Sequence, residues 1–193
     1  QRISEEEAIS LIRKLPEYGI NFIDTARAYS VSEEYIGAAI EGMRDKFVIA
    51  TKSQGRTKEA MAEEIETSLK NLRTDYIDLY QVHFVQAQSF DTIVGPGGAL
   101  EALLEAMAAG KIRHIGITNH RHHIAKAAIE SGNFETLQFP FSHLAGEVDL
   151  ELVRLSREAD MGFIAMKGLS GGLLTNAEAC YAFMQQHESV VPI

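Results

Sequence analysis

Four side chains of types that suit proton transfer stand at or just beyond the ends of short apolar runs: Asp24, Tyr29, Lys52 and His83. A tyrosine hydroxyl can donate a proton, but its ordinary pKa of about 10 makes it a slow acid near neutral pH. A nearby ammonium group lowers that pKa, and a carboxylate can hold the ammonium in place. A histidine can orient a substrate oxygen by hydrogen bonding. The set predicts carbonyl reduction, in which Tyr29 donates the proton and Lys52 lowers the pKa of Tyr29. Asp24 would hold Lys52 in place, and His83 would orient the substrate oxygen.

Each of these residues taken alone also has an ordinary structural interpretation. Asp24 could cap a turn, Tyr29 could be a loop aromatic, and His83 could be a satisfied core histidine. Their joint position at strand ends favours function, since charged Lys52 and Asp24 are costly to bury unless they are paired or used.

The elements that would position these residues are short apolar runs alternating with helical stretches. Continuous rather than alternating hydrophobicity is typical of parallel strands buried on both faces. The predicted strands are Asn21–Ala26, Phe47–Lys52, Tyr76–His83, His114–Asn119, Thr136–Phe141, Gly162–Lys167 and Val190–Ile193. The predicted helices are Ser4–Tyr18, Ser32–Gly42, Lys58–Leu72, Ala99–Ala109, Ile124–Ser131, Asp149–Ala159 and Asn176–Gln186. Gly110, Gly132 and Gly162 stand where helix C-caps are expected.

Strict strand–helix alternation predicts an α/β fold with parallel strands and right-handed crossovers, either an open doubly wound sheet or a closed barrel. No GxGxxG motif follows any predicted strand, which disfavours the open dinucleotide-binding sheet. A helix precedes the first predicted strand, so we expect a (β/α)8 TIM barrel whose first strand and C-terminal part are missing from the chain. Residues 1–193 are then one partial barrel domain, with its active site at the carboxyl ends of the strands.

Composition narrows the class of protein. The net charge of −9 disfavours nucleic acid as a partner, because phosphate binding rests on clustered Lys and Arg. No apolar run approaches the roughly 20 residues of a membrane helix, so no membrane partner is expected. The one cysteine, Cys180, fits a reducing compartment and a cytoplasmic location. Composition predicts no particular oligomeric state.

Several segments resemble one family. NFIDTARAYSVSEEYIGAAI, FVIATKS, YIDLYQVH and KIRHIGITNH are similar, in this order and spacing, to the aldo-keto reductase superfamily. The resemblance implies a catalytic tetrad of Asp, Tyr, Lys and His, with Tyr five residues after Asp. Asp24, Tyr29, Lys52 and His83 fill all four positions.

The resemblance also implies cofactor contacts. Thr118 and Asn119 correspond to the family's Ser-Asn pair on the nicotinamide carboxamide, and Gln138 to its Gln on the next strand. Met166 stands where a stacking tyrosine is usual, and a thioether can pack on the ring in its place. The residues expected at the pyrophosphate are Lys167, Gly168, Leu169 and Gly171.

The resemblance therefore implies NADP(H) rather than NAD(H) as cofactor, and a small carbonyl compound as substrate. The segment MKGLSGGLL resembles a branch of the family that often carries a C-terminal iron–sulfur domain. Cys180 alone cannot ligate such a cluster, which is expected only in a missing C-terminal region.

Other interpretations remain open. A cofactor-binding regulatory or interaction protein has the same fold, and a barrel aldolase could use Lys52 or Lys167 as a Schiff-base lysine. His120, His122 and His123 could suggest a metal, but their spacing does not gather three ligands on one helix face, and no carboxylate is near them in the sequence. No metal site is expected.

Overall fold

The computed structural model describes residues 3–193, which divide into two compact units. The first unit comprises the chain as far as Val82 together with Thr92–His114. The second comprises His83–Asp91 and Ile115–Ile193. Each unit is built of parallel strands covered by helices.

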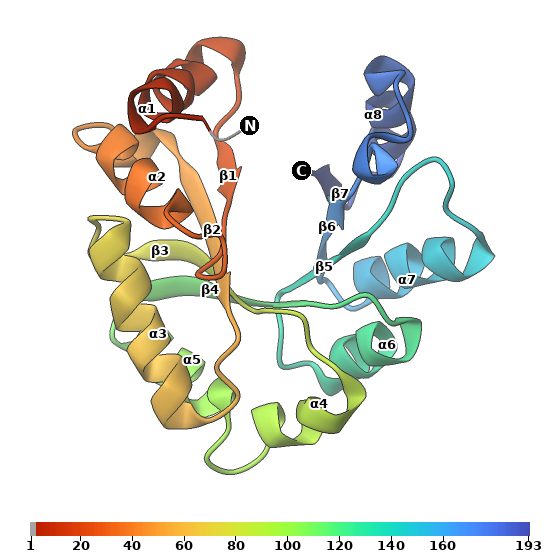
Figure 1. Ribbon diagram of the computed structural model, residues 1–193. Helices are drawn as coiled ribbons and strands as arrows, with labels where there is room; N and C mark the ends of the chain where they lie inside the picture. The colour runs from red at the N-terminus through yellow and green to blue at the C-terminus, as the bar shows by residue number, and fades with distance from the viewer. Residues whose placement is uncertain (1–2) are drawn as a thin grey trace. The chain divides into compact units, whose positions relative to one another are not determined.

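In the first unit, three parallel strands pair in chain order: β1 (Phe22–Asp24), β2 (Val48–Ser53) and β3 (Ile77–Val82). Asp24 pairs with Ala50 and Lys52 with Gln81, so the polar ends of the strands lie close together. The helices of this unit are α1 (Glu5–Lys14), α2 (Ser32–Ile40), α3 (Lys58–Asn71) and α5 (Ala99–Ala108). Figure 1 shows α1, α2 and α3 on one side of these strands. A short 3-10 turn, η2 (Arg44–Lys46), precedes β2.

The first helix begins with a capping box, in which the Ser4 side chain accepts the Glu7 N–H and the Glu7 carboxylate accepts the Ser4 N–H. The sequence predicted a helix over Ser4–Tyr18. The α-helix ends at Lys14, and the chain continues as the 3-10 turn η1 (Leu15–Tyr18). Pro16 explains the change, because it has no N–H to donate to the preceding turn. Gly19 then ends the turn with a left-handed φ of 73°.

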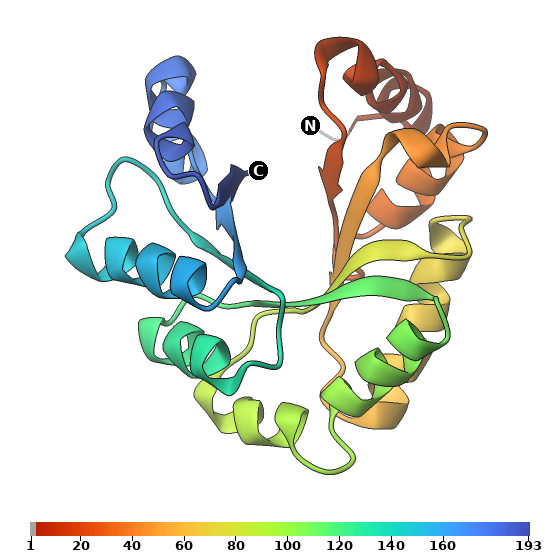
Figure 2. The same cartoon turned by 180° about the vertical axis from the view of Figure 1, so that it is seen from behind.

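Strand β4 (Ile112–Thr118) begins in the first unit and ends in the second. In the second unit it is followed by β5 (Thr136–Pro140), β6 (Gly162–Met166) and β7 (Val190–Pro192), each parallel to the one before. The helices here are α6 (His122–Ser131), α7 (Glu147–Glu158) and α8 (Ala177–Gln185), with a 3-10 turn, η3 (Ser170–Gly172). Figure 2 shows α6, α7 and α8 on one side of β5, β6 and β7.

The structure corrects two predictions of local structure. An additional helix, α4 (Ala87–Val94), occupies the stretch expected to be a loop, so residues 3–193 contain eight α-helices and not seven. Its apolar residues recur at helical spacing, and Ile93 is fully buried. Gly162 is the first residue of β6 and caps nothing, because α7 already ends at Glu158 and the left-handed residue is Asp160, with a φ of 55°.

Near the amino ends of its strands the first unit holds a charge cluster around the buried Asp78. The Asp78 carboxylate accepts hydrogen bonds from Arg44 (2.6 Å), from Arg113 (2.9 Å) and from the Ile49 N–H (2.9 Å). Both guanidinium groups also lie 4.0 Å from the centre of the Tyr76 ring. In a barrel this end serves stability, and the carboxyl ends carry the chemistry.

None of the helices in residues 3–193 combines the length and the apolar character needed to cross a membrane.

Candidate active site

At the carboxyl ends of β1 and β2, Lys52 and Asp24 form a buried ion pair. The Lys52 ammonium donates to Asp24 Oδ2 at 2.5 Å and to the Thr25 carbonyl at 2.8 Å. Gln81, on β3, donates from its amide to Asp24 Oδ1 at 3.4 Å. Lys52 is only 2% exposed, and burial lowers its pKa while Asp24 partly offsets that effect. Thus the expected anchoring of Lys52 by Asp24 is present.

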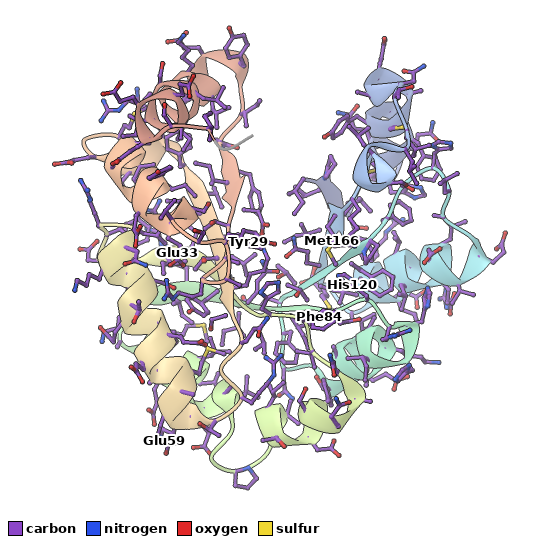
Figure 3. All side chains as sticks on the ribbon, in the orientation of Figure 1. Tyr29, Glu33, Glu59, Phe84, His120 and Met166 are labelled. Carbon is purple, nitrogen blue, oxygen red and sulfur yellow. The ribbon has the colours of Figure 1, made fainter. Side chains whose placement is uncertain are left out.

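Tyr29 lies in the loop between β1 and α2 of the first unit (Figure 3). The Lys52 Nζ is 5.1 Å from the centre of the Tyr29 ring. The pKa of Tyr29 is nevertheless raised, first by partial burial and then by the charge of Asp24. This direction is opposite to the lowering expected from the sequence, because burial and the Asp24 carboxylate both disfavour the phenolate. The hydroxyl of Tyr29 is therefore held in its acid form.

A buried carboxylate holds the loop that carries Tyr29. Glu33, in the first turn of α2, is 1% exposed. It accepts hydrogen bonds from Thr51 Oγ1 at 2.7 Å, from Arg27 at 2.8 Å and from Asn71 at 3.2 Å. Glu33 does not stand out in the sequence, since an acidic residue in a first helical turn is ordinary. Only its burial distinguishes it from the exposed Glu34 beside it.

Backbone hydrogen bonds tie the same loop to β2. The Thr25 N–H donates to the Ala50 carbonyl at 2.9 Å, and the Arg27 N–H donates to the Lys52 carbonyl at 3.0 Å. The loop thereby continues the ladder of β1 beyond Asp24. Tyr29 and Lys52 are positioned by one hydrogen-bonded frame.

His83 belongs to the second unit and lies one residue beyond β3, not within the strand that was expected to end in it. The next residue, Phe84, has a left-handed φ of 52°. Its N–H donates to Thr118 Oγ1 at 2.8 Å, and the Val85 N–H donates to the Thr118 carbonyl at 2.9 Å. Of the four expected catalytic residues, the first unit brings three together, and His83 is placed beside the expected cofactor residue Thr118.

The expected cofactor residues Thr118, Asn119 and Gln138 are neighbours in the second unit. Thr118 pairs with Gln138 across β4 and β5, and the Asn119 N–H donates to the Gln138 carbonyl at 3.3 Å. All three side chains are buried. Within residues 3–193, Asn119 Nδ2 and Gln138 Oε1 have no hydrogen-bond partner.

The unpaired amide donor of Asn119 and the unpaired amide acceptor of Gln138 together complement a carboxamide, which offers one carbonyl oxygen and one NH2 group. Buried polar groups left unpaired are costly in a folded protein. These residues therefore fit the carboxamide of a nicotinamide.

The segment after β6 forms a compact turn. Met166 ends the strand, and Lys167 is exposed with a left-handed φ of 60°. The Leu169 carbonyl accepts the N–H groups of Gly172 and Leu174. Gly168 lies close to α8, and a Cβ there would lie 2.6 Å from Met184 Cε, so the methionine side chain would have to shift. Gly171 is required by the backbone, with a φ of 69°.

Across residues 3–193, no group of three or more His, Cys, Asp or Glu side chains could hold a metal ion. The sequence shows no carboxylate near His120, His122 and His123, but the fold brings one close to this cluster. His122 Nε2 lies 2.8 Å from Asp149 Oδ1, which comes from α7. The pair joins α6 to α7.

Comparison with known proteins was consistent across sequence and structure. The model of the aldo/keto reductase family matches residues 1–190. The chain is 34% identical over 185 residues to the aldo-keto reductase YhdN of Bacillus subtilis, an alignment that covers 89% of this chain and 54% of YhdN. It is 29% identical to L-galactose dehydrogenase of Arabidopsis thaliana, covering 90% of this chain and 58% of that protein. The chain thus spans a little over half the length of these curated relatives.

Solved structures show the same fold. The holo form of aldo-keto reductase AKR11C1 from Bacillus halodurans has a TM-score of 0.78 and 28% identity, covering 90% of this chain and 61% of that chain. An aldo/keto reductase from Klebsiella pneumoniae, in complex with NADP and acetate, has a TM-score of 0.82 and 25% identity. The match covers 98% of this chain and 74% of that chain. The expected (β/α)8 class is confirmed, with seven strands in the described residues.

Proposed function

This chain belongs to the aldo/keto reductase family, and on that premise we propose that the full-length protein reduces an aldehyde or ketone with NADP(H). The observation that carries the proposal is the buried Lys52–Asp24 pair beside Tyr29. A buried ion pair gives little net stability, so its presence at strand ends favours a chemical role.

The roles of Tyr29, Lys52 and Asp24 follow from the geometry of the first unit. The reduced nicotinamide, when bound, supplies a hydride to the carbonyl carbon. Tyr29 gives its hydroxyl proton to the carbonyl oxygen, and solvent restores that proton afterwards. The ammonium of Lys52 stabilises the phenolate that Tyr29 becomes, and Asp24 holds Lys52 in position. We assign to His83 a hydrogen bond that orients the substrate oxygen.

The cofactor residues come from the second unit. We propose that Asn119 and Gln138 hold the nicotinamide carboxamide with their unpaired amide groups, beside Thr118. Met166 would pack on the nicotinamide ring, and the turn that contains Lys167, Gly168, Leu169 and Gly171 would face the pyrophosphate. NADP(H) is proposed over NAD(H) because a solved relative from Klebsiella pneumoniae is in complex with NADP.

The test is NADPH consumption by the full-length protein with a panel of aldehydes and ketones. Tyr29→Phe is expected to lower kcat at least about 100-fold, the loss typical of a missing general acid. Tyr18→Phe, at an exposed tyrosine on η1, is the matched control and keeps full activity. Equal turnover by wild type and Tyr29→Phe would contradict the assignment. Borohydride trapping of an aldehyde on Lys52 or Lys167, without NADPH consumption, would support an aldolase instead.

We also propose that the two units form one domain, which the family match across residues 1–190 supports. Calorimetry of the full-length protein should then give one unfolding transition for both. Cys180 is a free buried thiol, which supports a reducing compartment such as the cytoplasm. Because it is the one cysteine of the chain, any iron–sulfur cluster is assigned to a region outside residues 1–193.

A further inference from the structure

A pocket of about 530 Å³ lies in the second unit, between the residues that follow β3 and the start of α6. Its volume is in the range of ligand sites. Phe84 and His120 line it from the two sides, and their rings meet edge to face at a centroid distance of 5.4 Å. Figure 3 labels both residues. Phe84 is 41% exposed, so much of its ring is open to a ligand.

Arg121 is the one formally charged residue that lines this pocket. The imidazoles of His120 and His123 and the amides of Gln86 and Gln88 also line it, and no acidic residue does. The Arg121 guanidinium makes no ion pair with any residue that the structure describes. The pKa of His120 is lowered, first by burial and then by the positive charges of Lys167 and Arg121.

This charge is unfavourable where it stands. Arg121 is the N-cap of α6, and the first turn of that helix contains no acidic residue. Helix N-termini favour negative groups, so the charge of the exposed Arg121 is repelled by the helix dipole. An anion in the pocket would relieve this repulsion.

The pocket begins at the residue next to the proposed orienting histidine. Phe84 follows His83 directly, and the hydrogen bond from its N–H to Thr118 Oγ1 fixes this turn against β4. A substrate whose oxygen is bound by His83 can therefore extend over Phe84 towards Arg121.

We propose that the substrates are aldehydes or ketones that also carry a carboxylate, which Arg121 binds while the body of the molecule packs on Phe84. The planar guanidinium matches a carboxylate with two parallel hydrogen bonds, and Gln86 and Gln88 can add neutral donors. This inference rests on the proposed reductase function and names its substrate class.

The test compares 4-formylbenzoate with its methyl ester in the full-length protein with NADPH. The two aldehydes share a ring and differ in charge. Because their carbonyls differ in intrinsic reactivity, the quantity measured is the change in kcat/KM between wild type and variant for each. Arg121→Gln is expected to raise KM for 4-formylbenzoate about tenfold or more, as loss of a charge-assisted contact does. The same variant should change the KM for the methyl ester by less than about twofold.

Two variants complete the design. Arg157→Gln removes an exposed arginine of α7 in the same unit and should change neither substrate. Arg121→Lys keeps the charge but loses the planar fork, so its KM for 4-formylbenzoate should lie between those of wild type and Arg121→Gln.

The outcomes separate this inference from the proposed function. If both aldehydes are reduced but Arg121→Gln affects them equally, the carboxylate site is wrong and the reductase stands. If Arg121→Gln raises KM for NADPH instead, the pocket binds a cofactor phosphate, which also overturns the inference. If neither aldehyde is reduced, nor any other carbonyl compound, the proposed function falls and this substrate class falls with it.

Discussion

The Lys52 ammonium donates a 2.5 Å hydrogen bond to the Asp24 carboxylate, and both side chains are nearly buried. Lys52 is held a second time by the Thr25 carbonyl, and Asp24 a second time by Gln81. Neither charge can be removed without leaving the other in a poorly solvated place. The pair is therefore coupled both to stability and to the position of Tyr29.

Lys52→Met should lower the free energy of unfolding by about 3 kcal/mol, because it leaves the Asp24 charge buried without its partner. The double variant Lys52→Met with Asp24→Asn should lose less than the sum of the two single losses. Urea denaturation of all four proteins measures the coupling. Additive losses would show that the two charges do not stabilise each other.

The activity of the wild-type protein should fall at alkaline pH, at or above the ordinary tyrosine pKa of about 10, because Tyr29 must be protonated to act. Its raised pKa moves that fall to higher pH. Asp24→Asn removes the second cause of the raised pKa and keeps the first, burial, so the fall should begin at a lower pH than in wild type. The pH profile of kcat/KM tests this, with the exposed Asp45→Asn as control. A fall that moves to higher pH would refute the role given to Asp24.

Glu33→Gln should lower kcat several-fold and destabilise the protein by about 1–3 kcal/mol. The change leaves Arg27 without its anion and offers Thr51 a weaker acceptor, which loosens the loop that carries Tyr29. Glu34→Gln, the next residue and exposed, should change neither quantity. Unfolding curves and steady-state kinetics for both variants measure the difference, and equal effects at the two positions would contradict this role of Glu33.

Gln138→Met should weaken NADPH binding about tenfold while leaving the stability of the cofactor-free protein equal or higher. The reason is that Gln138 Oε1 is buried without a partner among the residues that the structure describes, and so costs free energy until a ligand pairs with it. Thr136→Val, on the same strand and also at an unpaired buried oxygen, should not affect binding. Fluorescence titration and thermal unfolding give the two quantities. Unchanged affinity in Gln138→Met would remove Gln138 from the cofactor site.

Asp78→Asn should destabilise the protein by about 3 kcal/mol without changing kcat at a temperature where the variant is folded. Two arginines and a backbone N–H depend on this buried carboxylate, which lies near the amino ends of the strands. Denaturation and kinetics on the same sample separate the two effects. A large fall in kcat would mean that this end of the unit is linked to the chemistry.

The sequence by itself determined the seven strands and seven of the eight α-helices of residues 3–193, with α4 missed. Hydrophobic period and capping residues are local signals, so the seven strands and the capping box of Ser4 and Glu7 could be predicted from neighbouring residues alone. Pairing of Asp24 with Lys52 was also predictable, because parallel strands bring their carboxyl ends to one edge.

The tertiary structure decided everything that depends on partners from distant segments. It buries Glu33 under Arg27 and Thr51. It raises rather than lowers the pKa of Tyr29, and within residues 3–193 it gives Arg121 no ion-pair partner. Solvation and Coulomb energy depend on distances in space, and a sequence pattern specifies only distances along the chain.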